Sequence, residues 1–356
     1  MATVINPSDE SLEEPNKYSY PVQVAALATG IPIIIFGFLG NLMTIIAVIK
    51  IKTLRTGANI FIVSLSVFDL MFVTIIIPMW VDTIRNNTWV FSSIYCQIYP
   101  ALTIFVVGGN LLSLCGTAVS RYLKIIHPNV YSRLFGRKRN IVALLCCFLS
   151  APILTVSPAV TGIWGKLGYN PDTITCEIIN DNSGYAIFLM LFAIIVPIMF
   201  ISFCYLRILC KVCSNRRKIQ AARNADGQQR STMREDLRFT RMMVCIFAAF
   251  LVSYTPYCIN ILIDPSAENK TRLFSTLVCF WLGSCINPVL YSLMNKKFRE
   301  AFLNIYKQVK ELTTVSRVEN VSRVENVSRV ENVSRVENIS RVENVSNREE
   351  ACASNN

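Results

Sequence analysis

The sequence predicts an all-α fold: a bundle of seven transmembrane helices, a short amphipathic helix on the membrane surface, and a disordered C-terminal tail. Of the 356 residues, 53% are hydrophobic and only 16% are charged, whereas about a quarter of the residues in a soluble domain are charged. The apolar residues gather in runs that are long enough to cross about 30 Å of hydrocarbon as helices. The expected spans are 24–49, 59–84, 93–126, 140–163, 184–213, 235–263 and 270–294.

The charge of the connections predicts how the chain is oriented. Basic residues gather between alternate spans, as in Arg216-Arg217-Lys218, whereas the opposite loops are near neutral or acidic. The positive-inside rule then makes this a multi-pass plasma-membrane protein with an extracellular N-terminus and a cytoplasmic C-terminus. The basic loops account for the net charge of +12, so we expect no nucleic-acid partner. The expected regions are an extracellular segment (1–22), the seven-span domain (23–294), an amphipathic cytoplasmic helix (295–310) and the tail (311–356).

The region after the last span alternates basic and apolar residues, as in Lys296, Phe298 and Ile305. This pattern predicts a helix that lies on an anionic inner leaflet, so membrane lipids are expected partners; the alternative is an extension of the last span. Beyond it, a six-residue unit, Ser-Arg-Val-Glu-Asn-Val, repeats as far as Ser346. Its period gives no lasting apolar face on a helix, which favours disorder.

Asp69 stands in the middle of the second span. A carboxylate there costs at least about 2.5–3.5 kcal/mol, so we expect it to face the bundle interior and to have partners. Asp69 and its partners would together hold a sodium ion; the alternative is a hydrogen-bonded network that packs the helices. With a single histidine, His127, a multi-histidine metal site is excluded, and no other cofactor is expected. Polar residues on other spans that supply partners for Asp69 are Asn41, Asn110, Ser284 and Asn287.

Single residues on successive spans resemble the motifs of the class A (rhodopsin-like) G-protein-coupled receptor family. The resemblance covers residues 24 to about 305, and it implies a receptor rather than an enzyme, with a heterotrimeric G protein and arrestin as partners. The residues that carry it are Gly40, Asn41, Asp69, Cys96, Arg121, Tyr122, Pro197, Tyr205, Phe250, Pro256, Asn287, Pro288, Tyr291 and Phe298.

The resemblance implies roles for residues toward both ends of the bundle. Cys96 and Cys176 match the family's extracellular disulfide. Arg121 matches the residue that engages the G protein, although Ser120 replaces the family's neighbouring acid. Asp236 stands where a second acid is common, so an Arg121–Asp236 pair is expected; alternatively, Arg121 only reaches to the membrane interface. The expected coupling and switch residues are Ser120, Arg121, Tyr122, Tyr205, Asp236, Asn287, Pro288 and Tyr291.

The hinge and the ligand pocket depart from the common pattern. Tyr254 replaces the family's tryptophan two residues before the hinge proline, Pro256. Thr103 replaces the aspartate of amine receptors, and Trp281 replaces the retinal-binding lysine, so an amine ligand and a photopigment are not expected. The lining suits a small neutral or lipid-like extracellular ligand; the alternative for any one of the aromatic residues is a role in helix packing. The expected pocket residues are Trp80, Tyr99, Thr103, Glu177, Tyr257, Asn260 and Trp281.

Two stretches of the sequence indicate which subfamily of these receptors the chain resembles. Residues 162–169 and the Ser-Arg-Tyr at 120–122 resemble the invertebrate Moody and Trapped-in-endoderm receptors, which are relatives of the melatonin receptors. That resemblance implies an inhibitory G protein. Because Ser120 replaces an acid, the alternative is a receptor that binds ligand without activating a G protein. Sequons at Asn86 and Asn269 fall in outer loops and are expected to carry glycan.

Overall fold

The structure is a computed structural model that describes residues 17–136, 138–142, 161, 166–179, 188, 190–214, 227–264 and 266–311, without the side chains of 190 and 227–236. The chain divides into two compact units, Met1–Phe302 and Leu303–Asn356. The bundle and every site discussed below belong to the first unit.

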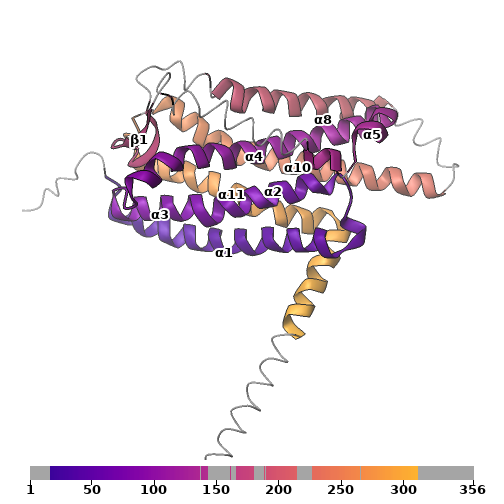
Figure 1. Cartoon of the computed structure of the whole chain (residues 1–356), viewed down its shortest axis with the longest axis horizontal. Helices are drawn as coiled ribbons and strands as arrows, with labels where there is room; N and C mark the ends of the chain where they lie inside the picture. Colours follow the sequence, from indigo (N-terminus) through magenta and orange to yellow (C-terminus); the bar gives the residue numbers. More distant parts are fainter. Residues whose placement is uncertain are drawn as a thin grey trace, which may run out of the picture. The chain divides into compact units, whose positions relative to one another are not determined.

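The described part of the first unit contains six helical segments that are long and apolar enough to cross a membrane (Figure 1). The third and last agree with the predicted spans 93–126 and 270–294, while the first begins at Tyr20 rather than at 24. Of the predicted fourth span, residues 140–142 are helical, in a helical stretch that begins at 138, and Thr161 is in a turn; its other residues lie outside the described part. The segments are α1 (Tyr20–Lys50), α2–η2–α3 (Asn59–Met71, Phe72–Ile76, Ile77–Asn86), α4 (Ser93–Ile126), η3–α8 (Met190–Ile195, Val196–Ser214), α10 (Gly227–Ile263) and α11 (Lys270–Met294).

The second segment is not a uniform helix. A π-helical turn, η2, joins α2 to α3 just before Pro78. Proline lacks an N–H and disturbs the regular ladder, and a π turn is one of the ways in which a helix absorbs such a break. Short elements connect the long ones: η1 (Lys52–Leu54), α5 (Pro128–Leu134) and a helix over 296–311. The helix over 296–311 agrees with the predicted amphipathic helix 295–310 to within a residue at each end.

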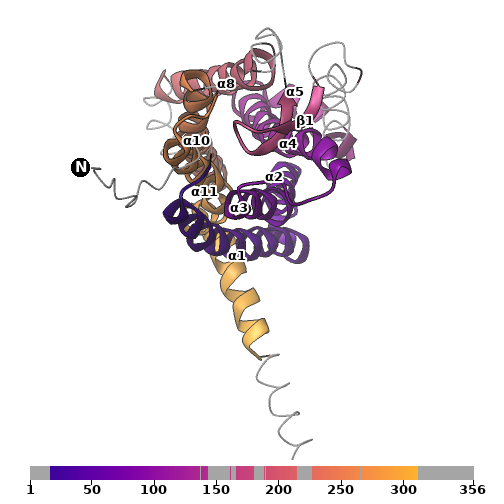
Figure 2. The same cartoon turned by 90° about the vertical axis from the view of Figure 1, so that its left-hand side faces the viewer.

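The all-α prediction overlooked a two-stranded antiparallel hairpin, β1 (Lys166–Asn170) and β2 (Thr175–Ile179). Its strands are five residues long and contain polar residues and Gly168, so they give no strong strand signal. A disulfide between Cys96 and Cys176 ties β2 to the first turns of α4. Figure 2 looks along the bundle and shows β1 lying across its end, beside α4.

The bundle buries polar groups and exposes apolar ones. Asn41, Asp69 and Asn110 are at most 4% exposed, whereas Phe36 and Val252 are at least 70% exposed. A protein surrounded by water rarely leaves large apolar side chains this exposed and carboxylates this buried. The distribution is that of helices whose outer faces contact hydrocarbon.

Helix α4 connects the two functional ends of the bundle. The 25 residue steps from Cys96 to Arg121 rise about 38 Å at 1.5 Å per residue. We call the end with the Cys96–Cys176 bridge the disulfide end, and the opposite end the Arg121 end.

Candidate functional site

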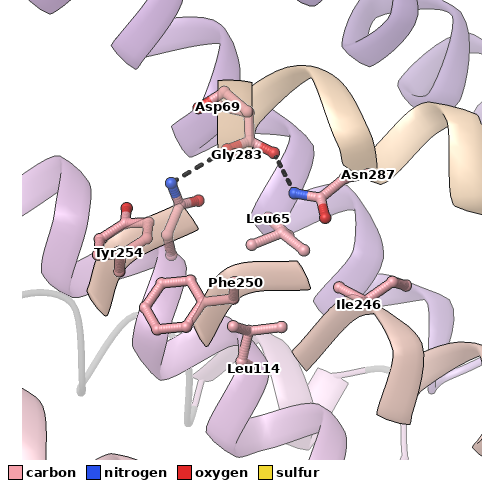
Figure 3. A pocket seen from close by; sticks show the side chains of 10 residues that line it. Leu65, Asp69, Leu114, Ile246, Phe250, Tyr254, Gly283 and Asn287 are labelled. Atoms are coloured by element: carbon pink, nitrogen blue, oxygen red, sulfur yellow. Dashed lines mark hydrogen bonds between the residues drawn. The ribbon is translucent and has the colours of Figure 1, made fainter. Parts of the chain in front are cut away.

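The predicted polar residues meet at the centre of the bundle. Asn110 Nδ2 donates a hydrogen bond to one oxygen of Asp69 at 3.1 Å, and Asn287 Nδ2 donates to the other at 2.8 Å (Figure 3). Asn41 Nδ2 donates to the backbone oxygen of Ser284 at 2.9 Å. The Asp69 carboxylate is therefore held by amides from α4 and α11, and α1 joins through the backbone of α11.

A cavity of about 10 Å³ lies beside Asp69, and this volume accommodates about one water-sized particle. Asn110 Oδ1 is buried and accepts no hydrogen bond from the described residues. Carboxylate, amide and hydroxyl oxygens are the ligands that hard cations prefer. The residues present therefore fit a single sodium ion. The cavity is lined by Leu65, Asp69, Asn110, Leu114, Ile246, Phe250, Tyr254, Gly283, Ser284 and Asn287.

Tyr254 forms part of the wall of this cavity, two residues before Pro256 in α10. Its ring stacks on Phe250 at 3.9 Å between centroids and meets the edge of Phe280 at 4.5 Å. A Cβ on Gly283 would lie 3.2 Å from Ser253 Cβ and 3.8 Å from Tyr254 Cε2. The absence of a side chain at Gly283 lets α11 lie close to the segment of α10 around Pro256, so the predicted hinge borders the polar centre directly.

Toward the disulfide end, four of the predicted pocket residues lie in a buried aromatic region. Trp80 lies 6.1 Å from both Tyr257 and Trp281, and Tyr257 stacks on Phe280 at 5.2 Å. Tyr99 OH donates to the Ile76 backbone oxygen at 3.3 Å. Trp281 is fully buried, and its Nε1–H has no hydrogen-bond partner among the described residues. Thr103, the fifth, donates to the Tyr99 backbone oxygen at 2.9 Å.

The sixth predicted pocket residue, Asn260, belongs to a polar clamp between α10 and α11. Arg272 Nε donates to Asn260 Oδ1 at 2.8 Å, and Arg272 Nη2 lies 2.8 Å from Asp264. Asp264 also accepts hydrogen bonds from the backbone N–H groups of Glu268 and Asn269. Since Oδ1 is engaged, the free group of Asn260 is its amide nitrogen, which is buried without a partner in the described part of the chain.

Glu177, the last predicted pocket residue, lies on β2 and accepts a hydrogen bond from Asn170 across the hairpin. Burial raises the pKa of its carboxyl above the ordinary value, the Asn170 bond opposes this, and the nearby Asp172 adds repulsion. The hairpin is tied further by Lys270, whose ammonium donates to the Asp172 backbone oxygen and lies 5.9 Å from the Tyr18 ring centroid.

At the Arg121 end, the Arg121 guanidinium lies over the Phe239 ring, 3.7 Å from its centroid. Arg121 is 4% exposed, and Ser120 is fully buried, with no partner for its hydroxyl among the described residues. The side chain of Asp236 lies outside the described part, so the predicted Arg121–Asp236 pair stays a prediction. Near Arg121, a cavity of about 280 Å³ is lined by Thr53, Leu54, Thr56, Ala58, Asn59, Arg121, Lys124, Tyr131, Phe239, Asn295 and Lys297.

The remaining predicted switch residues pack close to this end. Tyr205 on α8 is buried and lies 6.0 Å from the Phe247 ring, and Tyr291 on α11 stacks on Phe298 at 5.3 Å. Tyr122 contacts the His127 ring at 5.8 Å. Pro288, inside α11, packs against Gly40: a Cβ on that glycine would lie 2.9 Å from the proline ring.

Two residues at these sites were missed in the sequence. Phe239 stands in an arginine-rich stretch at the base of α10, and Arg272 stands in the first turn of α11, after Lys270 and Thr271. The single signal for Phe239 is its aromatic side chain between Arg238 and Arg241. For Arg272 there was no signal in the chain, because its partners become neighbours only when α10 and α11 pack together.

Comparison with known proteins agrees with this geometry. The family model of the 7 transmembrane receptor (rhodopsin family) matches residues 40–291. The chain is 30% identical to the melatonin receptor type 1A of Phodopus sungorus, over 76% of this chain and 77% of that protein. It is 28% identical to Protein trapped in endoderm-1 of Drosophila melanogaster, over 85% and 84% of the two chains.

Two further similarities concern length and fold. The chain is 24% identical to the G-protein coupled receptor moody of Drosophila melanogaster over 86% of its own length, but it spans about half of that protein (54%). Squid rhodopsin matches with a TM-score of 0.69 and 21% identity over 83% of this chain and 91% of that chain, which shows the seven-helix fold. The chain is thus a multi-pass membrane receptor and not an enzyme, and it belongs to the rhodopsin family of seven-transmembrane, G-protein-coupled receptors.

Proposed function

We propose that this receptor passes the binding of an extracellular ligand at the disulfide end to a heterotrimeric G protein at the Arg121 end. The observation that carries the proposal is the basic cavity of about 280 Å³ beside Arg121, with Lys124 and Lys297 in its wall. Such a cavity suits a partner segment with acceptor groups. It lies on the far side of the polar centre from the aromatic region, so the two ends communicate through α4, α10 and α11.

The orientation belongs to the same proposal. The disulfide end faces the oxidising extracellular side, where disulfides persist, and the Arg121 end faces the cytoplasm, as the positive-inside rule requires. The basic residues Lys124, Lys297 and Arg55 all belong to the Arg121 end.

The ligand that fits best is small and neutral or lipid-like. The predicted pocket residues are mainly aromatic, and Glu177 is their one charged member. Trp281 Nε1 and Asn260 Nδ2 are buried donors without partners among the described residues, so a ligand with acceptor oxygens would satisfy them. We further propose an inhibitory G protein, which the resemblance to the Moody and Trapped-in-endoderm receptors implies, and a sodium ion at Asp69 that stabilises the resting receptor.

A nucleotide-exchange assay tests the proposal. Purified full-length receptor in lipid nanodiscs is mixed with each class of purified heterotrimer, with and without lipid extracts. We expect exchange on the inhibitory class to accelerate with an active extract, and Arg121→Ala to abolish that acceleration. Arg85→Ala, which changes the same residue type on α3 near the disulfide end, is the matched control and should leave exchange unchanged.

A second function is favoured by Ser120, which replaces the acid beside Arg121: a receptor that binds ligand without activating a G protein. It predicts that an extract raises the melting temperature of the receptor, which reports binding, while no heterotrimer class exchanges faster. That pair of results would overturn the leading proposal.

A further inference from the structure

One contact at the Arg121 end joins two helices through an aromatic residue. Arg121 Cζ lies 3.7 Å from the centroid of the Phe239 ring. Arg121 belongs to α4 and Phe239 to α10. The contact therefore connects the Arg121 ends of these helices, which are 118 residues apart in the sequence (239 minus 121).

We propose that Phe239 positions Arg121 in the resting receptor: its ring holds the guanidinium by a cation–π contact, and activation separates the two. This inference rests on the proposed G-protein coupling, because it names the restraint that coupling must release.

The chemistry of the two side chains supports this role. A guanidinium cannot shed its proton, so Arg121 stays charged although only 4% of it is exposed. A charge removed from water gains from the negative face of an aromatic ring, and it gains more as the site becomes drier. The planar guanidinium also stacks on a ring in a way that an ammonium does not.

The surrounding charges make an aromatic partner useful. Lys124 and Lys297 line the same cavity as Arg121 and Phe239, and these cations repel the guanidinium. Ser120 supplies no charge where the family has an acid, and its side chain is fully buried. The Phe239 ring attracts Arg121 without adding an anion, and its contribution adds to the other contacts that Arg121 makes.

The position of the ring gives the contact a consequence for coupling. Phe239 and Arg121 share the wall of the cavity of about 280 Å³. A partner segment that enters this cavity and engages Arg121 has to draw the guanidinium away from the ring. Separation of α4 from α10 and exposure of Arg121 are then the same event.

The test compares variants of Phe239 in the full-length receptor. Phe239→Leu keeps an apolar side chain but removes the π face, whereas Phe239→Tyr and Phe239→Trp keep it. We expect Phe239→Leu to raise ligand-independent nucleotide exchange about two- to thirty-fold, the range that corresponds to one cation–π contact. The aromatic variants should stay at the wild-type rate. Phe200→Leu is the matched control, because Phe200 lies on α8 and is 46% exposed.

A second readout does not depend on any G protein. Spin labels on non-canonical residues introduced at the exposed positions 50 and 241 report the distance between the Arg121 ends of α1 and α10. We expect a longer distance in Phe239→Leu, and also in Arg121→Lys, which keeps the charge but loses the planar stack. If no heterotrimer responds to the wild type, the coupling proposal fails while this distance still tests the contact.

Asp236→Asn separates the contact from the competing ion pair. An unchanged distance and unchanged basal exchange in Phe239→Leu and Arg121→Lys, with Asp236→Asn raising both, would assign the restraint to Asp236 and overturn the role of Phe239. Loss of the resting distance in Phe239→Tyr and Phe239→Trp as well as in Phe239→Leu would also overturn it, because the π face is then irrelevant.

Discussion

Two amides hold one carboxylate at the centre of the bundle. Asn110 and Asn287 each donate a hydrogen bond to a different oxygen of Asp69, at 3.1 and 2.8 Å. The amides satisfy the acceptors of the carboxylate but do not neutralise its charge, because the described residues that line the adjacent cavity include no cation. An ion of about one water's size would complete the arrangement.

The first prediction concerns this charge. If sodium binds beside Asp69, it stabilises the folded receptor by mass action, so the melting temperature of the wild type should be higher in sodium chloride than in potassium chloride. A stabilisation of about 1 kcal/mol corresponds to a rise of about 2 °C or slightly less for a chain of this size. Asp69→Asn keeps the shape and removes the charge, and it should melt equally in both salts.

Asp82→Asn provides the control, since Asp82 lies on α3 outside the cavity. It should keep the sodium dependence. A wild-type receptor that melts at one temperature in both salts would show that the Asp69 cluster is a packing network only.

The second prediction concerns Asp264 in the clamp between α10 and α11. Hydrogen bonds from the backbone N–H groups of Asn269 and Glu268, and then the Arg272 side chain, hold the pKa of its carboxyl below the ordinary value. A depressed folded-state pKa contributes stability above the unfolded pKa of about 4, and this stability is lost as the pH falls through the folded-state pKa. The melting-temperature difference between wild type and Asp264→Asn should therefore shrink as the pH falls from about 7 to about 3. A difference that stays constant over this range would contradict the assignment.

At the scale of elements, close helix contact depends on glycines that face rings. Gly109 on α4 faces Phe68 on α2, and an added Cβ would lie 2.3 Å from that ring. Gly116, two turns further along α4, faces Phe61 in the same way. The rings of α2 thus fill the places where α4 has no side chain.

The third prediction compares two neighbouring glycines. Gly109→Ala forces the Phe68 ring to move, and overpacking of this kind costs about 1–3 kcal/mol, so the melting temperature of the purified receptor should fall. Gly108→Ala adds the same methyl group where no heavy atom lies within 4 Å and should leave the melting temperature equal or higher. Equal effects of the two substitutions would mean that α2 and α4 do not meet at Gly109.

Which elements the sequence predicts depends on the length of their signal. Helices α4 and α11 repeat an apolar pattern over many turns, so their predicted limits agree with the structure. Each strand of the hairpin and the π turn before Pro78 are only five residues long, and their geometry depends on the disulfide and on neighbouring helices. Local pattern carries little information about either.

At the scale of the whole molecule, the Asp69 cluster could be predicted because each of its members is a polar residue within an apolar span. Phe239 and Arg272 were not predictable, since their roles depend on partners brought close by the packing of α10 against α4 and α11. The sequons give a separate test of orientation: Asn86 and Asn269 lie near the disulfide end, and the tail repeats contain further Asn-Val-Ser sequons, beginning at Asn320, which the predicted topology places on the opposite side of the membrane.

The fourth prediction uses these sequons to measure orientation. Asn269 is exposed and caps α11 through its Oδ1, which accepts from the Arg272 backbone N–H, whereas glycan attaches to the amide nitrogen. The amide nitrogen of Asn86 donates to the Asp82 backbone oxygen. We therefore expect more glycan on Asn269 than on Asn86, as measured by mass spectrometry, and Asn269→Gln should abolish most of the glycosidase-sensitive shift. Detection of glycan at Asn320 in the tail would show that the receptor has the opposite orientation.

The fifth prediction concerns the tail, which lies outside the described residues. Each repeat sets a serine three residues after a glutamate, as in Glu319 and Ser322. Phosphorylation adds about −1.5 to −2 charges per serine, and several such serines on one segment favour multivalent binding to the basic surface of arrestin. Truncation after Leu312 should therefore reduce agonist-dependent arrestin recruitment and slow internalisation. Recruitment at the full-length rate would make the repeats a spacer.

The bridge between Cys96 and Cys176 also sets an order on the synthesis of the receptor. The two cysteines are 80 residues apart, and between them α4 carries the chain to the opposite side of the bilayer. They can meet in one compartment only after the chain has crossed back, so the bond cannot form until a complete out-and-return pair of spans is in the membrane. A nascent receptor that fails to make this return keeps Cys96 and Cys176 on opposite sides of the membrane. Formation of this bond therefore requires that both spans have been inserted.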